Sequence, residues 1–171
     1  MGAGERSRGQ AQGDPAQKDV KLTIAAIGRA GRGPERDLYE HYAGRIRWPL
    51  ALRELEEKRK LSAAEMIKRE GELLLAAIPG KAVRVALDRR GKVLDSEAFA
   101  VRLGRWHDDS VSNVAFLVGG ADGHGEALLN EASLVVSFGA MTWPHLLARA
   151  MLAEQIYRAQ QLLAGHPYHR A

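Results

Sequence analysis

Residues 114–120 read Val-Ala-Phe-Leu-Val-Gly-Gly, an uninterrupted apolar run that ends in two glycines. A short apolar run bounded by a turn signal predicts a strand that is buried on both faces. Strands of this kind are typical of parallel sheets, which helices cover on both sides. Ligands bind such sheets beyond the carboxyl ends of the strands, so the paired glycines mark a candidate binding loop.

The sequence on both sides of this run alternates between strand and helix patterns. We expect strands at residues 22–28, 50–55, 82–87 and 134–138, a turn at 88–92, and helices at 34–46, 62–78, 95–107, 124–130 and 144–163. Ser62 and Glu65 form a capping box at the start of one helix, and Pro144 is expected at the first helical position of another. The alternation predicts a single α/β domain with a mostly parallel sheet and helices on both faces.

The first 19 residues differ from the rest of the chain. They are rich in Gly, Ala and Gln, with three positive and three negative charges and no hydrophobic period. Such a segment buries too little surface to offset its ordering entropy. We therefore predict a disordered extension at residues 1–19 and one folded domain at residues 20–171.

Composition limits the classes of function. The chain has 171 residues, 46% of them hydrophobic, no cysteine and a net charge of +4. The absence of cysteine excludes thiolate chemistry and fits a cytoplasmic protein, and no apolar run is long enough to cross a membrane. The positive charge suits a polyanionic partner such as RNA. No set of residues has the pattern of a metal site, so we expect no metal.

Three loops follow predicted strands and are candidate ligand sites, namely Leu87-Asp88, 119–123 and 138–145. The sequence Gly-Gly-Ala-Asp-Gly at 119–123 is no dinucleotide fingerprint, but paired glycines allow close backbone approach to a ligand. The alternative is a tight turn. Residues 138–144, Phe-Gly-Ala-Met-Thr-Trp-Pro, are unusually apolar for a loop. They would suit a pocket for a flat ring such as adenine, or a plain buried crossover.

The chain closes with His166-Pro-Tyr-His-Arg170, one residue before its end. Aromatic, imidazole and guanidinium groups together suit stacking on a base and gripping a phosphate. The alternative is a frayed terminus without function. Two histidines three residues apart could also suggest a metal site, but no third ligand accompanies them.

Together these segments resemble the bacterial ribosomal RNA large-subunit methyltransferase H family. The resemblance spans Lys21 to Arg170 and is carried in order by residues 21–28 (Lys-Leu-Thr-Ile-Ala-Ala-Ile-Gly), Leu87-Asp88, the strand into Gly119-Gly120, Trp143-Pro-His145 and the terminal His-Pro-Tyr-His-Arg. It implies a SPOUT-class homodimer with a C-terminal trefoil knot, a topology that is rare among proteins. It also implies methylation of N3 of a pseudouridine in helix 69 of 23S ribosomal RNA, with S-adenosylmethionine as the methyl donor.

The resemblance also implies roles for individual residues. Those expected to hold the cofactor are Leu87, Gly119, Gly120, Phe138, Gly139, Ala140, Met141, Thr142 and Trp143. Those expected to act in catalysis are His145, Tyr168, His169 and Arg170, and those expected to bind RNA are Arg149, His166, Tyr168 and Arg170. Either solvent or His169 is expected to accept the N3 proton, and His145 has the same unperturbed titration range.

Two features depart from the family pattern. The family loop usually reads Gly-Gly-Pro-Glu-Gly, whereas this chain has Gly-Gly-Ala-Asp-Gly, so that Asp122 is expected to replace a glutamate. The N-terminal extension is also atypical. Two rival functions stay open, a ribosome-associated RNA-binding protein without catalysis and a SPOUT methyltransferase that acts on transfer RNA. The first would need no cofactor loop, and the second would usually have an added RNA-binding module.

Overall fold

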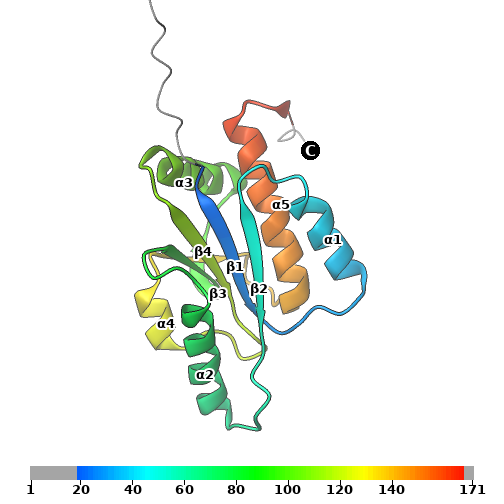
Figure 1. Ribbon diagram of the computed structural model, residues 1–171, viewed down its shortest axis with the longest axis vertical. Coiled ribbons are helices and arrows are strands. Elements are labelled where there is room, and N and C mark those ends of the chain that lie inside the picture. Colours follow the sequence, from blue (N-terminus) through cyan, green and yellow to red (C-terminus); the bar gives the residue numbers. More distant parts are fainter. Residues whose placement is uncertain (1–18, 168–171) are drawn as a thin grey trace, which may run out of the picture.

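The structure is a computed structural model that describes residues 19–167 (Figure 1). Five strands alternate with five helices along the described part of the chain. In order they are β1 (Lys21–Ile27), α1 (Pro34–Ala43), β2 (Leu50–Leu55), α2 (Ala63–Ala76), β3 (Val83–Val93), α3 (Ser96–Asp108), β4 (Asn113–Val118), α4 (Glu126–Glu131), β5 (Leu134–Ser137) and α5 (His145–Leu163). The predicted alternation is confirmed, and most predicted boundaries lie within three residues of those observed.

The five strands form one sheet in the order β2-β1-β4-β3-β5, and every neighbouring pair is parallel. The carboxyl ends of all strands therefore lie along one edge of the sheet. The connection from β2 to α2, drawn at the bottom of Figure 1, belongs to this edge. Residues 87–90 of β3 and the loops after β4 and β5 meet there as well, close to the arrangement that the sequence predicted.

Helices cover both faces of the sheet, as predicted. On one face α1, α3 and α5 pack on the larger core, around Phe99, Phe116 and Ile156. Of these, α1 and α5 lie side by side in Figure 1. On the other face α2 and α4 cover a smaller core that contains Leu74 and Leu128. Because β4 contributes buried residues to both cores, its continuous apolar sequence is explained.

Residues 88–92 do not form the turn that the sequence predicted. Instead β3 runs on to Val93, and its register against β5 shifts, so that Leu87 and Lys92 both pair with Val136. Between them, Gly91 lies against the β5 backbone so closely that a Cβ there would be 2.6 Å from the carbonyl carbon of Val135. The β3 backbone thus lies directly against the β5 backbone at Gly91. The trefoil knot that the resemblance implies stays a prediction.

The helix ends are set by local hydrogen bonds. Ser62 caps α2 in the predicted capping box, with Ser62 Oγ accepting from the Glu65 N–H and the Glu65 carboxylate accepting from the Ser62 N–H. Asp95 caps α3 by accepting a 2.7 Å hydrogen bond from the Ala98 N–H. Pro144 occupies the N-cap of α5 and not its first helical position, so the prediction for this residue was wrong by one place. At either position a backbone N–H would have no partner within the helix, so proline costs no helical hydrogen bond.

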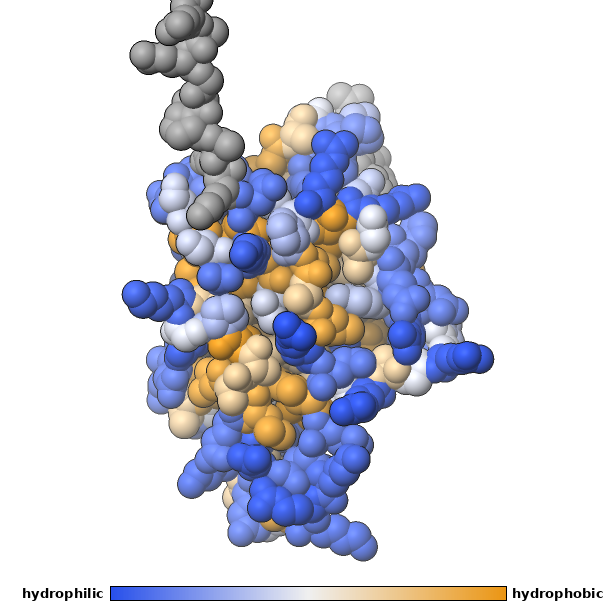
Figure 2. All heavy atoms as spheres, viewed as in Figure 1, coloured by the Kyte–Doolittle hydropathy of each residue, from blue (hydrophilic) through white to orange (hydrophobic). Residues whose placement is uncertain are grey.

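The surface is mixed in polarity. In the view of Figure 2, hydrophobic residues gather over the middle of the molecule, where Figure 1 shows the strands. The bottom of the same view, formed by the connection from β2 to α2 and the start of α2, is hydrophilic. Lys58 and Lys60 are exposed in this connection. Among residues 19–167, no helix is long and apolar enough to span a membrane.

Candidate functional site

A cavity of about 540 Å³ opens at the carboxyl edge of the sheet. Its volume falls within the range of small-molecule sites, about 300–1,000 Å³. Residues 87–90 of β3, the loops after β4 and β5 and the start of α5 enclose it. Its lining includes eight of the nine residues expected to hold a cofactor, which are Leu87, Gly119, Gly120, Phe138, Gly139, Met141, Thr142 and Trp143. The structure therefore brings together three segments that are separate in the sequence.

The loop after β4 is tightly folded, and glycine is required at two of its positions. A Cβ on Gly119 would lie 3.1 Å from the carbonyl carbon of Gly123, which itself has a positive φ of 72°. A Cβ on Gly120 would lie 2.9 Å from a carboxylate oxygen of Glu70 in α2. Burial, followed by the negative charge of Asp122, raises the pKa of Glu70. The double glycine therefore lets this loop pack against α2 beside the cavity.

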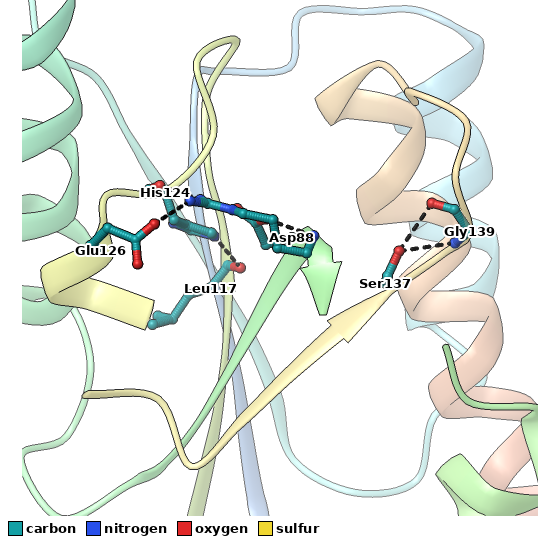
Figure 3. Close-up of polar contacts among 7 residues, drawn as sticks. Asp88, Leu117, His124, Glu126, Ser137 and Gly139 are labelled. Carbon is teal, nitrogen blue, oxygen red and sulfur yellow. Dashed lines mark hydrogen bonds and ion pairs between the residues drawn. The ribbon is translucent and has the colours of Figure 1, made fainter. Parts of the chain in front are cut away.

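Arg90, within the second half of β3, joins this strand to the loop after β4. Its partners Asp88, His124 and Glu126 are labelled in Figure 3. Its Nε and Nη2 donate to the two carboxylate oxygens of Asp88, at 2.8 and 2.9 Å. The same guanidinium donates to the carbonyl oxygen of His124 at 2.6 Å and to Glu126 at 2.7 Å. Burial alone would raise the pKa of Asp88, but the hydrogen bonds from Arg90 outweigh it and lower the pKa to about 2. Asp88 is therefore a carboxylate at neutral pH and is already occupied by protein groups.

His124 has a structural position behind the glycine loop. The residue is 5% exposed, and its Nε2 lies 3.1 Å from the carbonyl oxygen of Leu117. Burial lowers the pKa of His124, so the ring is neutral at pH 7 and its Nε2–H can donate to that carbonyl. The labelled contacts of Figure 3 place this bond between β4 and the start of α4.

The loop after β5 forms the opposite wall of the cavity. Ser137 holds its first turn, since Ser137 Oγ donates to the carbonyl oxygen of Gly139 at 3.0 Å and accepts from the Gly139 N–H at 3.1 Å (Figure 3). Gly139 has a φ of 107°, which favours glycine. Trp143 closes the loop by donating from Nε1 to the carbonyl oxygen of Phe138 at 3.3 Å. Ala140 is exposed and is not among the residues that line the cavity, unlike the rest of the predicted segment.

His145 begins α5 and also lines the cavity. A Cβ on Gly28, at the end of β1, would lie 3.0 Å from Nε2 of His145, so the ring packs on the backbone there. Burial, followed by the positive charge of Arg149, lowers the pKa of His145. The imidazole is therefore neutral at pH 7 and can accept a proton.

Arg149 does not occupy the RNA-facing position that was predicted for it. It is 2% exposed, and its Nη1 donates to Glu54 at 2.8 Å. Its Nη2 donates to the carbonyl oxygens of Ile27 and Gly28, at 2.6 and 2.7 Å. With its guanidinium turned into the protein, Arg149 cannot contact a phosphate. The RNA-binding role was implied by the family resemblance, whereas α5 turns this side chain inward.

The C-terminal candidates are only partly within the described structure. Tyr168, His169 and Arg170 lie outside residues 19–167, so their predicted roles stay predictions. His166 is exposed just beyond α5, where its N–H donates to the carbonyl oxygen of Gln161 at 2.9 Å. His166 thus lies at the end of α5 opposite to His145. Within residues 19–167 no group of three or more histidine, aspartate or glutamate residues could hold a metal ion.

Sequence reasoning did not identify four polar residues around the cavity. Arg90, His124 and Glu126 form the network described above, and Glu70 contacts the glycine loop from α2. Their partners are backbone groups or residues distant in sequence, which no local pattern encodes. The only available signal was the position of Arg90 just after Leu87-Asp88.

Comparison with known proteins agrees with this geometry. A family model described as "Predicted SPOUT methyltransferase" matches residues 20–169. The ribosomal RNA large subunit methyltransferase H of Rhodospirillum centenum is 57% identical over 152 residues, which cover 89% of this chain and 100% of that protein. The protein of the same name from Paramagnetospirillum magneticum is 53% identical over 151 residues, which cover 88% and 99%.

A methyltransferase from Legionella pneumophila, solved with bound SAM, is 12% identical, with a TM-score of 0.47 over 84% of this chain and 68% of that one. The family match and the two relatives each extend over nearly all of the domain that begins at Val20. This chain therefore belongs to the SPOUT methyltransferase family.

Proposed function

We propose that this protein transfers a methyl group from S-adenosylmethionine to N3 of a pseudouridine in helix 69 of 23S ribosomal RNA. The observation that carries the proposal is the cavity at the carboxyl edge, whose walls are residues 87–90 of β3 and the loops after β4 and β5. In the sequence these same segments carry the resemblance to the large-subunit methyltransferase H family. The relatives that bear this name match over their whole length, which supports ribosomal RNA as the substrate.

The cavity fits S-adenosylmethionine in size and chemistry. Leu87, Val118 and Phe138 provide an apolar surface for the adenine ring, and the glycine loop provides backbone groups beside it. When bound, the cofactor supplies an electrophilic methyl group carried by a sulfonium. The residues that would hold it are Leu87, Gly119, Gly120 and the segment 138–143, with Ala140 contributing least because it does not line the cavity.

The remaining work of the protein is to place the pseudouridine and to remove its N3 proton. Holding the two reacting atoms together can lower the barrier by about 7–11 kcal/mol. A side-chain base contributes a further factor of about 10²–10⁴. His145 is suited to this role because it lines the cavity and is neutral at pH 7. His169 is the other candidate base.

We further propose that the active site is shared between two copies of the chain. The helix α5 has 19 residues and is therefore about 28 Å long. His145 lies at one end of it, beside the cavity, and the terminal Tyr168, His169 and Arg170 follow its other end. Even fully extended, the seven residues from Leu163 to Arg170 span at most about 25 Å. If these residues act at a cofactor site, that site belongs to a second copy.

An apolar groove supports this homodimer. The groove, of about 590 Å³, includes Leu38, Tyr42 and Phe99 on the face formed by α1, α3 and α5. It shares Phe138 and Gly139 with the cofactor cavity, so a second copy seated there would lie beside the site. Leu38 is 40% exposed, and its change to Glu should convert the protein to a monomer in light scattering. A dimer that survives this change would refute this placement of the interface.

The proposed function is tested by mapping modified nucleosides in ribosomal RNA from a strain that lacks the gene. We expect the 3-methylpseudouridine of helix 69 to be absent, and to return when the gene is restored. A strain restored with the His145→Ala variant should show slower methylation at the same nucleotide. Unchanged ribosomal RNA, with a lost methyl group in transfer RNA, would refute the proposal in favour of the transfer-RNA alternative. No change in any RNA methylation would favour the non-catalytic one.

A further inference from the structure

Arg149 is a buried charge next to the candidate base. It is among the largest fully buried side chains of the described residues, and its Nε has no hydrogen-bond partner there. Burial lowers its pKa, and the charge of Glu54 opposes this effect. Replacing a buried ion pair by apolar residues of similar volume is often neutral or stabilising. Stability alone is therefore a weak reason for an arginine at this position.

The hydrogen bonds of Arg149 join three elements. Its donors reach the carbonyl oxygens of Ile27 and Gly28 at the end of β1, and the carboxylate of Glu54 in β2. The same oxygen of Glu54, Oε1, accepts from the N–H of Ala30 at 2.8 Å. Arg149 and Glu54 thus fix the beginning of the β1–α1 loop against α5.

His145 lies directly on this junction. It precedes Arg149 by four residues in α5, so the two side chains share one face of the helix. A Cβ on Gly28 would lie 3.0 Å from Nε2 of His145 and 3.5 Å from Nη2 of Arg149. The imidazole and the guanidinium therefore both lie against the Gly28 backbone.

We propose that Arg149 is a positioning residue for methyl transfer, which fixes the His145 ring in the cavity by tying Glu54 and the end of β1 to α5. This inference rests on the proposed function and adds to it a residue that touches neither cofactor nor RNA. If Arg149 were merely structural, the effect of replacing it would be the same whether or not His145 is present.

A double-mutant cycle distinguishes the two roles. The variants are Arg149→Lys, which keeps the charge but loses the forked donors, His145→Ala, and the two combined. We expect Arg149→Lys to lower kcat about 10–100-fold while the Kd for S-adenosylmethionine changes less than about threefold, because small misplacements of a reacting group cost up to about 10² in rate. In the His145→Ala background, Arg149→Lys should have no further effect on kcat. The control is Arg84→Lys, which alters an arginine that pairs with Glu131 away from the cavity.

The results that would overturn the proposal are definite. Full kcat in Arg149→Lys, or a loss of the same factor with and without His145, would show that Arg149 does not act through the imidazole. If Arg149→Lys fails to fold, Glu54→Gln serves in its place, because it keeps the shape but weakens the bond to the guanidinium. Its expected loss of kcat should likewise vanish in the His145→Ala background.

A spectroscopic measurement separates this proposal from the proposed function. Glu54→Gln should shift the ring resonances of His145 in proton–nitrogen NMR spectra, while those of His107 at the end of α3 stay in place. Unchanged His145 resonances would refute the positioning role even in an active enzyme. Conversely, shifted His145 resonances in a protein that methylates no RNA would support the positioning of His145 by Arg149 and Glu54. That result would refute only the proposed function.

Discussion

The close approach of the β3 and β5 backbones predicts that Gly91 accepts no side chain. An alanine at this position would place its Cβ 2.6–2.7 Å from three backbone atoms, which are the carbonyl carbon and oxygen of Val135 and the carbonyl carbon of Val136. Ordinary contacts between such atoms are about 3.5–4.0 Å. Because all three obstacles are backbone, no rotamer change can relieve the clash, and the strands must separate by about 1 Å.

The cost of Gly91→Ala can be estimated from this geometry. Overpacking of a well-packed site costs about 1–3 kcal/mol. The separation also weakens the pairing of Leu87 and Lys92 with Val136, and each hydrogen bond contributes about 1 kcal/mol. The free energy of unfolding should therefore fall by about 2–4 kcal/mol. For a protein of this size, that corresponds to a fall in Tm of roughly 4–16 °C.

Urea and thermal unfolding of Gly91→Ala and the unaltered protein measure this loss. The control is Gly80→Ala, because a Cβ at Gly80 would meet no atom within 4 Å. Its stability should change by less than about 0.5 kcal/mol. Cofactor affinity should also fall in Gly91→Ala, since residues 88–90 line the cavity. If Gly91→Ala is as stable as Gly80→Ala, the two strands do not approach each other as closely as described.

Three further predictions concern other parts of the molecule. Asp88→Asn should be about 1–2 kcal/mol less stable at pH 7, a value reduced for the 42% exposure of Arg90. Because the pKa of Asp88 is lowered to about 2, its contribution is present above about pH 4 and lost as the pH falls toward 2, so unfolding curves of the two proteins that fail to converge in acid would contradict this. A chain that begins at Val20 should match the full chain in Tm and activity. One that begins at Lys21 should be less stable, because Val20 is 1% exposed. Equal Tm values for the two shortened chains would count against the place of Val20 in the core. Removal of residues 166–170 should abolish methyl transfer in single-turnover assays on ribosomes. Calorimetry should still detect S-adenosylmethionine binding, also after chelator treatment. Full activity of the shortened protein would refute the role of the terminus.

Much of the fold could be predicted because its signals are local. The buried strands are continuous apolar runs, and the helices begin at recognisable caps such as Ser62 and Asp95. The parallel order then follows from the alternation of elements. Residues 88–92 were predicted wrongly because their charges and glycine are typical of a turn. Their actual path depends on Val136, which lies more than 40 residues later in the sequence.

The candidate site divides in the same way. Its three segments could be located from the sequence because each follows a predicted strand, and parallel strands end at one edge. The polar network could not be located, because Arg90 bonds to a backbone carbonyl of His124 and to Glu126 in another element. Such partners are brought together only by the tertiary fold. A local pattern therefore indicates where a site lies, but not which of its charged side chains are already bound to other protein groups.

Arg149 illustrates why this distinction matters for function. The family resemblance implied an RNA contact for it. Its partners, Glu54 and two carbonyl oxygens, lie 95 to 122 residues away in the sequence and bind the guanidinium inside the protein. An arginine that is buried with its guanidinium bound to protein groups cannot add to RNA affinity, but it can fix the positions of the groups beside it. Substitutions of Arg149 should therefore alter the rate of the chemical step at saturating RNA and leave the salt dependence of RNA binding unchanged.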